Sequence, residues 1–221
     1  MLSSAYRQSS QAGADAEKAD PDNSLLWRMP LRRLESEAIR DSMLAIAGTL
    51  NTKQGGPPVK TKAEPDGMVV VDGKALADPS DSYRRSIYLA ARRRYNLSML
   101  GVFDHPVMST NATTRGASAV VLQSLMMMND KEVLVQSRKF AERIARKAGA
   151  DMSDSTRLTL AYRYAFGRSP AADELQWTRG LLDRERQRYI AAGKPQADSH
   201  LDALASVCHV LLNTNEFLYV E

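Results

Sequence analysis

Apolar residues recur with helical spacing through most of the second half of the chain. The clearest stripe belongs to a predicted last helix, which begins near Asp198. Its members fall at i, i+3, i+4, i+7, i+10 and i+11: Leu201, Leu204, Ala205, Cys208, Leu211 and Leu212. This spacing puts them on one face, so we expect that face to pack against the body. Polar residues 213 to 216 should end the helix, and residues 217 to 219 should fold back onto the body.

Earlier segments show the same periodicity. Asn129 is placed to cap one helix, with Glu132 at its third position, which is close to a capping box. Gly167 follows another helix where a left-handed cap is favoured. Helices are therefore predicted over residues 31 to 50, 117 to 128, 129 to 148, 155 to 166 and 170 to 192.

A Gly- and Pro-rich insertion over residues 51 to 82 interrupts this helical pattern. Within it, Met68 to Val71 form a β-branched run that ends at the turn signal Asp72-Gly73. Ser86 to Leu89 form a second short strand candidate. We predict a small two-stranded ribbon over about residues 68 to 90, which would depend on packing against helices for its stability.

These patterns together predict a mainly α-helical globular protein with one small β ribbon. Residues 1 to 24 have little apolar content and should form a loosely ordered arm, so residues 25 to 221 form a single helical domain. Hydrophobic residues make up 43% of the chain and charged residues 25%, which is typical of a soluble domain. No apolar run reaches the roughly 18 residues of a membrane span. The N-terminal residues lack a secretory leader, so a complete chain with this start would be cytoplasmic.

The sequence lacks the residue patterns of common catalytic and cofactor sites. Its one cysteine, Cys208, lies among apolar residues and is interpreted as a small core residue. Three isolated histidines give no metal-ligand spacing, and no dinucleotide, P-loop or nucleophile-elbow motif is present. We therefore expect no metal and no cofactor in this chain, and no reaction can be assigned. Met126 to Met128 cannot share one helical face, and core filling is favoured over a soft binding surface.

A short segment after Phe103 concentrates polar chemistry. It contains an acid, an imidazole, an amide, a hydroxyl and a guanidinium: Asp104, His105, Asn111, Thr113 and Arg115. Because sites concentrate on loops held by a rigid scaffold, Asp104 and His105 are the candidate catalytic residues. Asn111, Thr113, Arg115 and the nearby Arg92 are the candidate ligand-binding residues. The competing interpretation is that Asp104 and Thr113 cap turns and helix starts.

Arginine is clustered, although the net charge is only +4. The clusters are Arg32-Arg33, Arg84-Arg85 and Arg92 to Arg94, and each could meet an acidic partner or an anionic polysaccharide. Nucleic-acid modules interleave basic and aromatic residues more systematically, so no nucleic-acid partner is expected. A solvated flank of a helix or strand is the alternative for all three clusters.

Several blocks of sequence together resemble the planctomycete-specific domain one family. They run in the family's order over nearly the whole chain: Leu26-Trp27-Arg28, Arg32 to Asp41, Arg85 to Tyr88, Phe103-Asp104 with Pro106, Leu122 to Leu125 with Asn129, and Leu212 to Tyr219. Ala112 and Thr114 stand where family members often carry a Cys and a second Arg. This departure weakens a site built on that loop.

The resemblance implies a domain of unknown function at the C-terminus of large exported proteins. It implies an extracytoplasmic or periplasmic setting, with upstream domains of the same protein as partners and haem in an upstream cytochrome c-like domain. Because the similarity starts abruptly near Ser3, we expect the chain to be a C-terminal piece or a short form.

Three alternative functions of different classes follow from these observations. The first is a helical scaffold module that binds a partner domain or an anionic glycan through the arginine clusters and the loop from 103 to 116. The second is part of a carbohydrate-active or redox-linked enzyme with its site between Asp104 and Arg115. A structural spacer without a ligand is the third.

Overall fold

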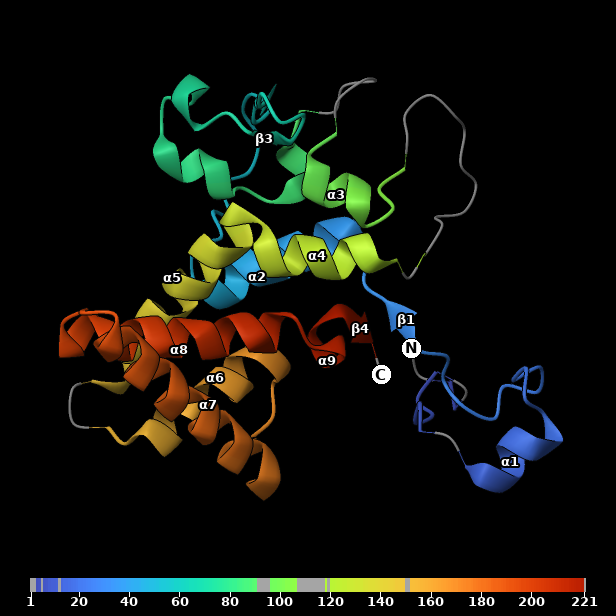
Figure 1. The fold of residues 1–221 in the computed structure, drawn as a ribbon. Helices are drawn as coiled ribbons and strands as arrows, with labels where there is room; N and C mark the ends of the chain where they lie inside the picture. The colour runs from blue at the N-terminus through green and yellow to red at the C-terminus, as the bar shows by residue number, and fades with distance from the viewer. Residues whose placement is uncertain are drawn as a thin grey trace.

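The computed structural model describes residues 3–4, 6–11, 13–90, 96–106, 118, 120–149 and 152–220. Over these residues the protein is mainly α-helical, as predicted from the periodicity. The largest unit is a helical body of four helices, in which α8 packs between α5 and α7 (Figure 1). Its helices are α5 (Lys131–Ala148), α6 (Asp154–Phe166), α7 (Ala172–Ala191) and α8 (Gln196–Leu212).

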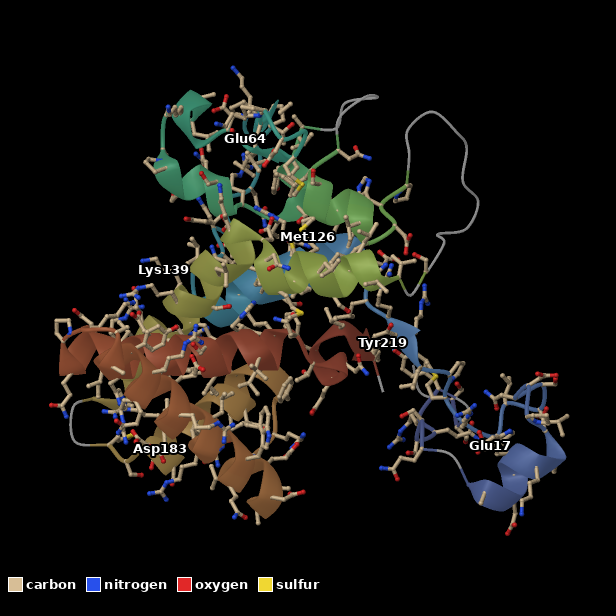
Figure 2. The ribbon with its side chains drawn as sticks, viewed as in Figure 1. Glu17, Glu64, Met126, Lys139, Asp183 and Tyr219 are labelled. Carbon is tan, nitrogen blue, oxygen red and sulfur yellow. The ribbon has the colours of Figure 1, made fainter. Side chains whose placement is uncertain are left out.

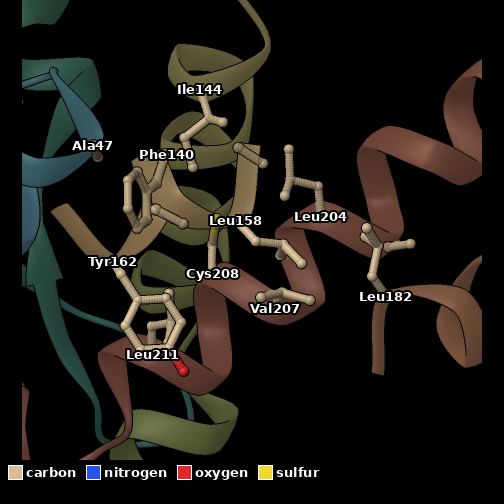
Figure 3. Packing of buried hydrophobic residues seen from close by; sticks show 13 residues of the cluster. Ala47, Phe140, Ile144, Leu158, Tyr162, Leu182, Leu204, Val207, Cys208 and Leu211 are labelled. Atoms are coloured by element: carbon tan, nitrogen blue, oxygen red, sulfur yellow. The ribbon is translucent and has the colours of Figure 1, made fainter. Parts of the chain in front are cut away.

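The apolar stripes of these helices meet in one core. Phe140 and Ile144 of α5, Leu158 of α6, and Leu204 and Leu211 of α8 are fully or almost fully buried (Figure 3). Cys208 lies in the same cluster, where burial raises the pKa of its thiol far above the ordinary value. The prediction that the α8 stripe faces the body is confirmed.

Local capping fixes where these helices begin and end. Oδ1 of Asp130 accepts the backbone N–H groups of Glu132 and Val133, so Asp130 is the N-cap of α5. The predicted cap at Asn129 was therefore wrong by one residue. Asn129 is the last residue of α4 (Val121–Asn129), and its amide donates to the Leu125 carbonyl. Gly167 ends α6 in the left-handed conformation, as expected.

A second cluster packs on the other side of α8 and α5. It joins α2 (Ser36–Ala47), α3 (Ser98–Val102), α4 and α9 (Asn215–Leu218) around side chains that include Ile39, Met43 and Phe217. Gly48 ends α2 at φ 76°, and Arg143 of α5 donates to the carbonyls of Ala45 and Ile46. The end of α2 is thereby tied to the helical body.

The β ribbon forms with a different partner from the predicted one. β3 (Val69–Val71) was expected, but it pairs antiparallel with β2 (Thr61–Ala63). The predicted strand at residues 86 to 89 is instead the 3-10 helix η3 (Ser86–Tyr88), in which Arg40 and Asp41 bind the hydroxyl of Ser86. Two further 3-10 helices, η1 (Gly73–Ala75) and η2 (Pro79–Tyr83), complete this segment.

The two ends of the domain meet in a second strand pair. β1 (Arg32–Arg33) lies antiparallel to β4 (Tyr219–Val220), and the Leu34 N–H donates to the Leu218 carbonyl at 2.8 Å. Phe217 and Leu218 are buried, so the predicted return of the C-terminal residues onto the body is confirmed. Figure 2 labels Tyr219, the β4 residue that pairs with Arg33.

The residues before β1 lie apart from the rest of the protein (Figure 1). Their one described helix, α1 (Ala14–Ala19), has no buried residue. Local contacts hold this arm together, such as the bond from the Trp27 ring N–H to the Asp20 carbonyl at 2.8 Å. Among all the helices described, none combines the length and hydropathy needed to cross a membrane.

Candidate functional site

Asp104 lies immediately after α3, in an unusual backbone conformation. Its φ is 60°, in the left-handed region that non-glycine residues rarely occupy. The carboxylate accepts the Ser118 backbone N–H at 2.8 Å and the Ser118 hydroxyl at 2.9 Å. It therefore joins the end of α3 to the residues that lead into α4.

Arg33 completes this cluster from β1. Its Nη2 lies 2.8 Å from Oδ2 of Asp104 and 3.0 Å from the Phe103 carbonyl oxygen, and its Nη1 donates to the Ser118 carbonyl at 2.6 Å. The residue is only 8% exposed, so these bonds use the guanidinium away from water. Gln123 of α4 donates to the carbonyls of Val102 and Ser118 and closes the cluster from the other side.

The charge state of Asp104 follows from these partners. Burial alone would raise the pKa of Asp104, but the Ser118 and Arg33 hydrogen bonds outweigh it and hold the pKa below the ordinary value. The carboxylate is ionised at neutral pH, and both of its oxygens accept hydrogen bonds. A general acid needs the opposite shift, so this geometry fits a carboxylate that positions α4 better than one that transfers a proton.

His105 points to groups of its own loop and of α2. Its Nδ1 lies 3.0 Å from the Pro106 carbonyl, and its Nε2 lies 3.4 Å from Oε1 of Glu37. Among the described residues, the His105 ring makes no hydrogen bond or ion pair with the Asp104 carboxylate, although the two residues are adjacent in the sequence. Within the residues that the structure describes, the two predicted catalytic residues therefore bind different partners and do not act on each other.

The predicted ligand-binding residues Arg92, Asn111, Thr113 and Arg115 lie outside the described residues. No group of three or more His, Cys, Asp or Glu residues converges within the described ranges in a way that could hold a metal ion.

In each of the two described arginine pairs, 32–33 and 84–85, one side chain is buried and the other is exposed. Arg84 is 1% exposed and donates to the carbonyls of Lys53, Gly55 and Pro57, while its guanidinium stacks 3.9 Å from the Tyr88 ring centroid. Arg85 beside it is exposed and lies 3.6 Å from Asp41. Arg33 and Arg32 repeat this division, because only Arg32 faces solvent. The inward arginines bind backbone carbonyls and are not offered to a ligand.

The structure adds an exposed apolar surface on α4 that no sequence motif indicates. Only Gln123 and Met127 of α4 are buried, while Val121 is 75% exposed, Leu122 63%, Leu125 48% and Met128 57%. We call these four exposed residues the apolar α4 face. The sequence signal was present, since residues 120 to 129 contain no charged side chain. Because Met126 to Met128 cannot share one helical face, at least one of them was expected to point outward; Met128 does so, while Met127 lies in the core.

A shallow hollow lies where the two core clusters meet. It has a volume of about 330 Å³ and is lined mainly by Ile46, Phe166, Phe217 and Tyr219, with Glu216 at its edge. Glu216 is bound by Arg168, which also holds Glu174. Glu216, one of the polar residues 213 to 216 that follow α8, therefore takes part in a surface ion-pair network.

The described part of the chain thus defines a mainly α-helical domain with two short antiparallel strand pairs, without a recognisable catalytic centre. The chain belongs to the PSD1 family, described as a protein of unknown function (DUF1553), whose family model matches residues 1–182. No curated protein and no solved structure matches the chain.

Proposed function

We propose that this chain is a non-catalytic scaffold domain that binds another polypeptide through the apolar α4 face. The observation that carries the proposal is the exposure of four large aliphatic side chains on a nine-residue helix that has no charged residue. Contiguous exposed apolar surface of this kind marks protein contacts. Its partner should present an uncharged aliphatic surface, such as the apolar side of a helix.

The helix that follows α4 also exposes large apolar side chains near its start. Leu134 and Val135 near the start of α5 are 46% and 43% exposed. Other large exposed residues, such as Ile87 on η3 and Trp177 on α7, lie on separate elements. Isolated exposed side chains are normal on soluble proteins, whereas four on one face of a nine-residue helix form a contiguous apolar surface that can anchor a partner.

The contacts of Asp104 support a positioning role beside this surface. Asp104 and Arg33 fix Ser118, which precedes α4 by three residues, and Gln123 fixes α4 itself. Hydrogen bonds of this kind hold the binding helix rigid, so less conformational entropy is lost when a partner docks. They give no support to the alternative, a carbohydrate-active or redox-linked enzyme with Asp104 as its acid or base.

Anionic glycan binding draws little support from the described arginines. The guanidinium groups of Arg33 and Arg84 donate to backbone carbonyls, and that of Arg33 also donates to Asp104. Only Arg32 and Arg85 remain at the surface from these two clusters. We therefore favour an apolar protein partner over an anionic polysaccharide.

The resemblance described above adds a setting to this proposal. We propose an extracytoplasmic multidomain protein, in which upstream domains, one of them carrying haem, accompany this chain. The test is the gene sequence upstream of Met1, because a secretory leader and a Cys-x-x-Cys-His motif would encode that arrangement. An upstream reading frame without either feature would exclude it.

Site-specific photocrosslinking tests the docking surface. The photoreactive residue p-benzoylphenylalanine replaces Leu125 in one variant and Ile87 in a matched control, and both are irradiated in cells of the native host. We expect the Leu125 variant to form a discrete adduct whose crosslinked peptide is an uncharged apolar segment. The Ile87 variant should form none, because its exposed side chain stands alone on η3. Equal labelling from both positions, or no discrete adduct from position 125, would contradict the proposal.

A further inference from the structure

We infer that the apolar α4 face binds the same face of a second copy of this chain, so that two copies form a two-fold symmetric dimer. The inference rests on the proposed function and names the partner of the same surface. It is carried by the charge distribution on and around α4, and by the order of side chains along its exposed face.

Charge is the first argument. In a two-fold contact each patch meets an identical patch, so any charge at its centre would face a like charge. Residues 120 to 129 contain no Asp, Glu, Lys or Arg, although a quarter of the whole chain is charged. A contact centred on α4 therefore brings no charged side chain of this helix against a like charge, and its apolar character is typical of homodimer interfaces.

The order of the exposed side chains along α4 also suits a two-fold contact. Val121, Leu125 and Met128 are spaced i, i+4 and i+7, so they form one stripe with Leu125 in the middle. A two-fold axis beside Leu125 places each Val121 against Met128 of the other copy. The short branched side chain then faces the long flexible one, which can adapt to the space left to it. The paired helices run antiparallel, an arrangement in which their dipoles attract.

The edge of the face provides the polar rim that such interfaces have. After Leu134 and Val135, α5 presents the exposed residues Arg138 and Lys139. Both are close to Glu142, with Arg138 Nε 3.5 Å and Lys139 Nζ 3.1 Å from its carboxylate oxygens. Figure 2 shows Lys139 at the outer edge of this region and Met126 on α4. Because Glu142 pairs with both cations and Asp202 also pairs with Arg138, these positive charges are partly offset at the rim.

Light scattering coupled to size-exclusion chromatography tests the dimer on the full chain. Wild type should elute at twice the chain mass of 24.4 kDa. Leu125→Glu places two like charges at the centre of the contact and should raise the dissociation constant by about 100-fold or more. The matched control Ile87→Glu should leave the dimer intact, because Ile87 lies on η3. Circular dichroism checks that both variants keep the wild-type helix content.

Disulfide trapping is a second test, which detects the two copies side by side and does not require a variant that weakens the dimer. Cys208 is the chain's single cysteine and is buried, so a Leu125→Cys variant adds one accessible thiol. Under a copper-phenanthroline oxidant, two such thiols beside a two-fold axis should join the copies rapidly. The Ile87→Cys control should stay uncrosslinked at the same concentration.

The outcomes separate this inference from the proposed function. A wild-type chain that stays at 24.4 kDa over a wide concentration range would overturn the dimer, as would a dimer that Leu125→Glu leaves intact. If position 125 then photocrosslinks a different polypeptide, the scaffold proposal stands with another partner. If position 125 forms no adduct at all, both proposals fail.

Discussion

The helical body and the segment from residue 51 to 90 are held together by different kinds of interaction. In the helical body, α5 to α8 bury Phe140, Ile144, Leu158 and Leu204 against one another. In the segment, Val59 and Val69 are the buried large apolar residues. Arg84 of the segment and Arg40 of the neighbouring α2 are both buried and donate to backbone carbonyls of the segment. Burial outweighs the attraction of Asp41 and lowers the pKa of Arg40.

This difference shows how irregular chain becomes ordered without a large core. Apolar packing is non-directional, so its stabilisation is spread over all the residues of the helical body. A buried guanidinium must satisfy fixed donor directions, and each missing acceptor has a cost. The segment should therefore depend on a few arginines, whereas the helical body should depend on its packing as a whole. Four substitutions test this comparison.

Phe140→Ala should have the largest effect. Phe140 is fully buried and packs edge-on against Tyr164, with ring centroids 6.4 Å apart. The cavity and the lost contacts should lower the free energy of unfolding by about 4 kcal/mol in urea denaturation. Trp177→Ala, which removes a half-exposed aromatic ring from α7, is the control and should change it by less than about 0.5 kcal/mol. Equal losses in both variants would show that the core of the helical body is not its main source of stability.

Arg84→Lys should cost about 2 to 3 kcal/mol, because an ammonium cannot reach all three carbonyls that the guanidinium binds. Hydrogen exchange should increase over residues 51 to 90 and stay slow in α5 and α8. Arg85→Lys makes the same change at the exposed neighbour and should have almost no effect. If Arg84→Lys loosened α8 as much as the segment, the two regions would unfold as one unit and the comparison would be wrong.

Asp104→Asn should cost about 1 to 2 kcal/mol, because the amide cannot accept from Ser118 and Arg33 as the carboxylate does. Since the folded pKa of Asp104 is lowered, its contribution is complete above the unfolded pKa of about 4 and is lost as pH falls further. The variant should therefore lose less stability than wild type below about pH 4. Asp22→Asn, at an exposed position in the N-terminal arm, is the control. A pH profile unchanged by Asp104→Asn would separate this carboxylate from the stability of the fold.

Glu174→Gln should have the smallest effect. Arg168 lowers the pKa of Glu174 to about 2, but 41% of the Arg168 side chain and 31% of the Glu174 side chain are exposed. Solvent screening limits the ion pair to less than about 1 kcal/mol. Its contribution is present above the ordinary pKa of 4.5 and is lost as pH falls toward 2. Thermal unfolding at pH 7 with and without added salt measures it, and a larger loss would place a polar interaction among the main supports of the helical body.

Periodicity allowed most of the helical body to be predicted, because the faces of α6 and α8 carry their apolar residues at helical spacing. The segment from 51 to 90 was less predictable. Val69 to Val71 formed the expected strand, but residues 86 to 89 had β-prone composition and became η3, because Arg40 and Asp41 of α2 bind Ser86. Those partners are more than forty residues away, and no local pattern records them.

The candidate site shows the same limit. Its chemistry-bearing residues were visible in the sequence, but the number of Asp104 hydrogen bonds was not, since Arg33 lies 71 positions earlier in the chain. The exposure of the apolar α4 face was equally hidden. Apolar content predicts that a helix has something to bury, and it does not say whether the same chain covers every side of it.

By itself, the sequence determined the helical class, the approximate positions of the main helices, the core residues of α8 and the family resemblance, because these depend on local spacing and residue type. Only the tertiary structure decided that β1 pairs with β4, that Arg33 and Arg84 turn inward, and that four apolar residues of α4 face solvent. Each of these outcomes depends on which distant segments share a surface, and residues near one another in sequence carry no direct record of that contact.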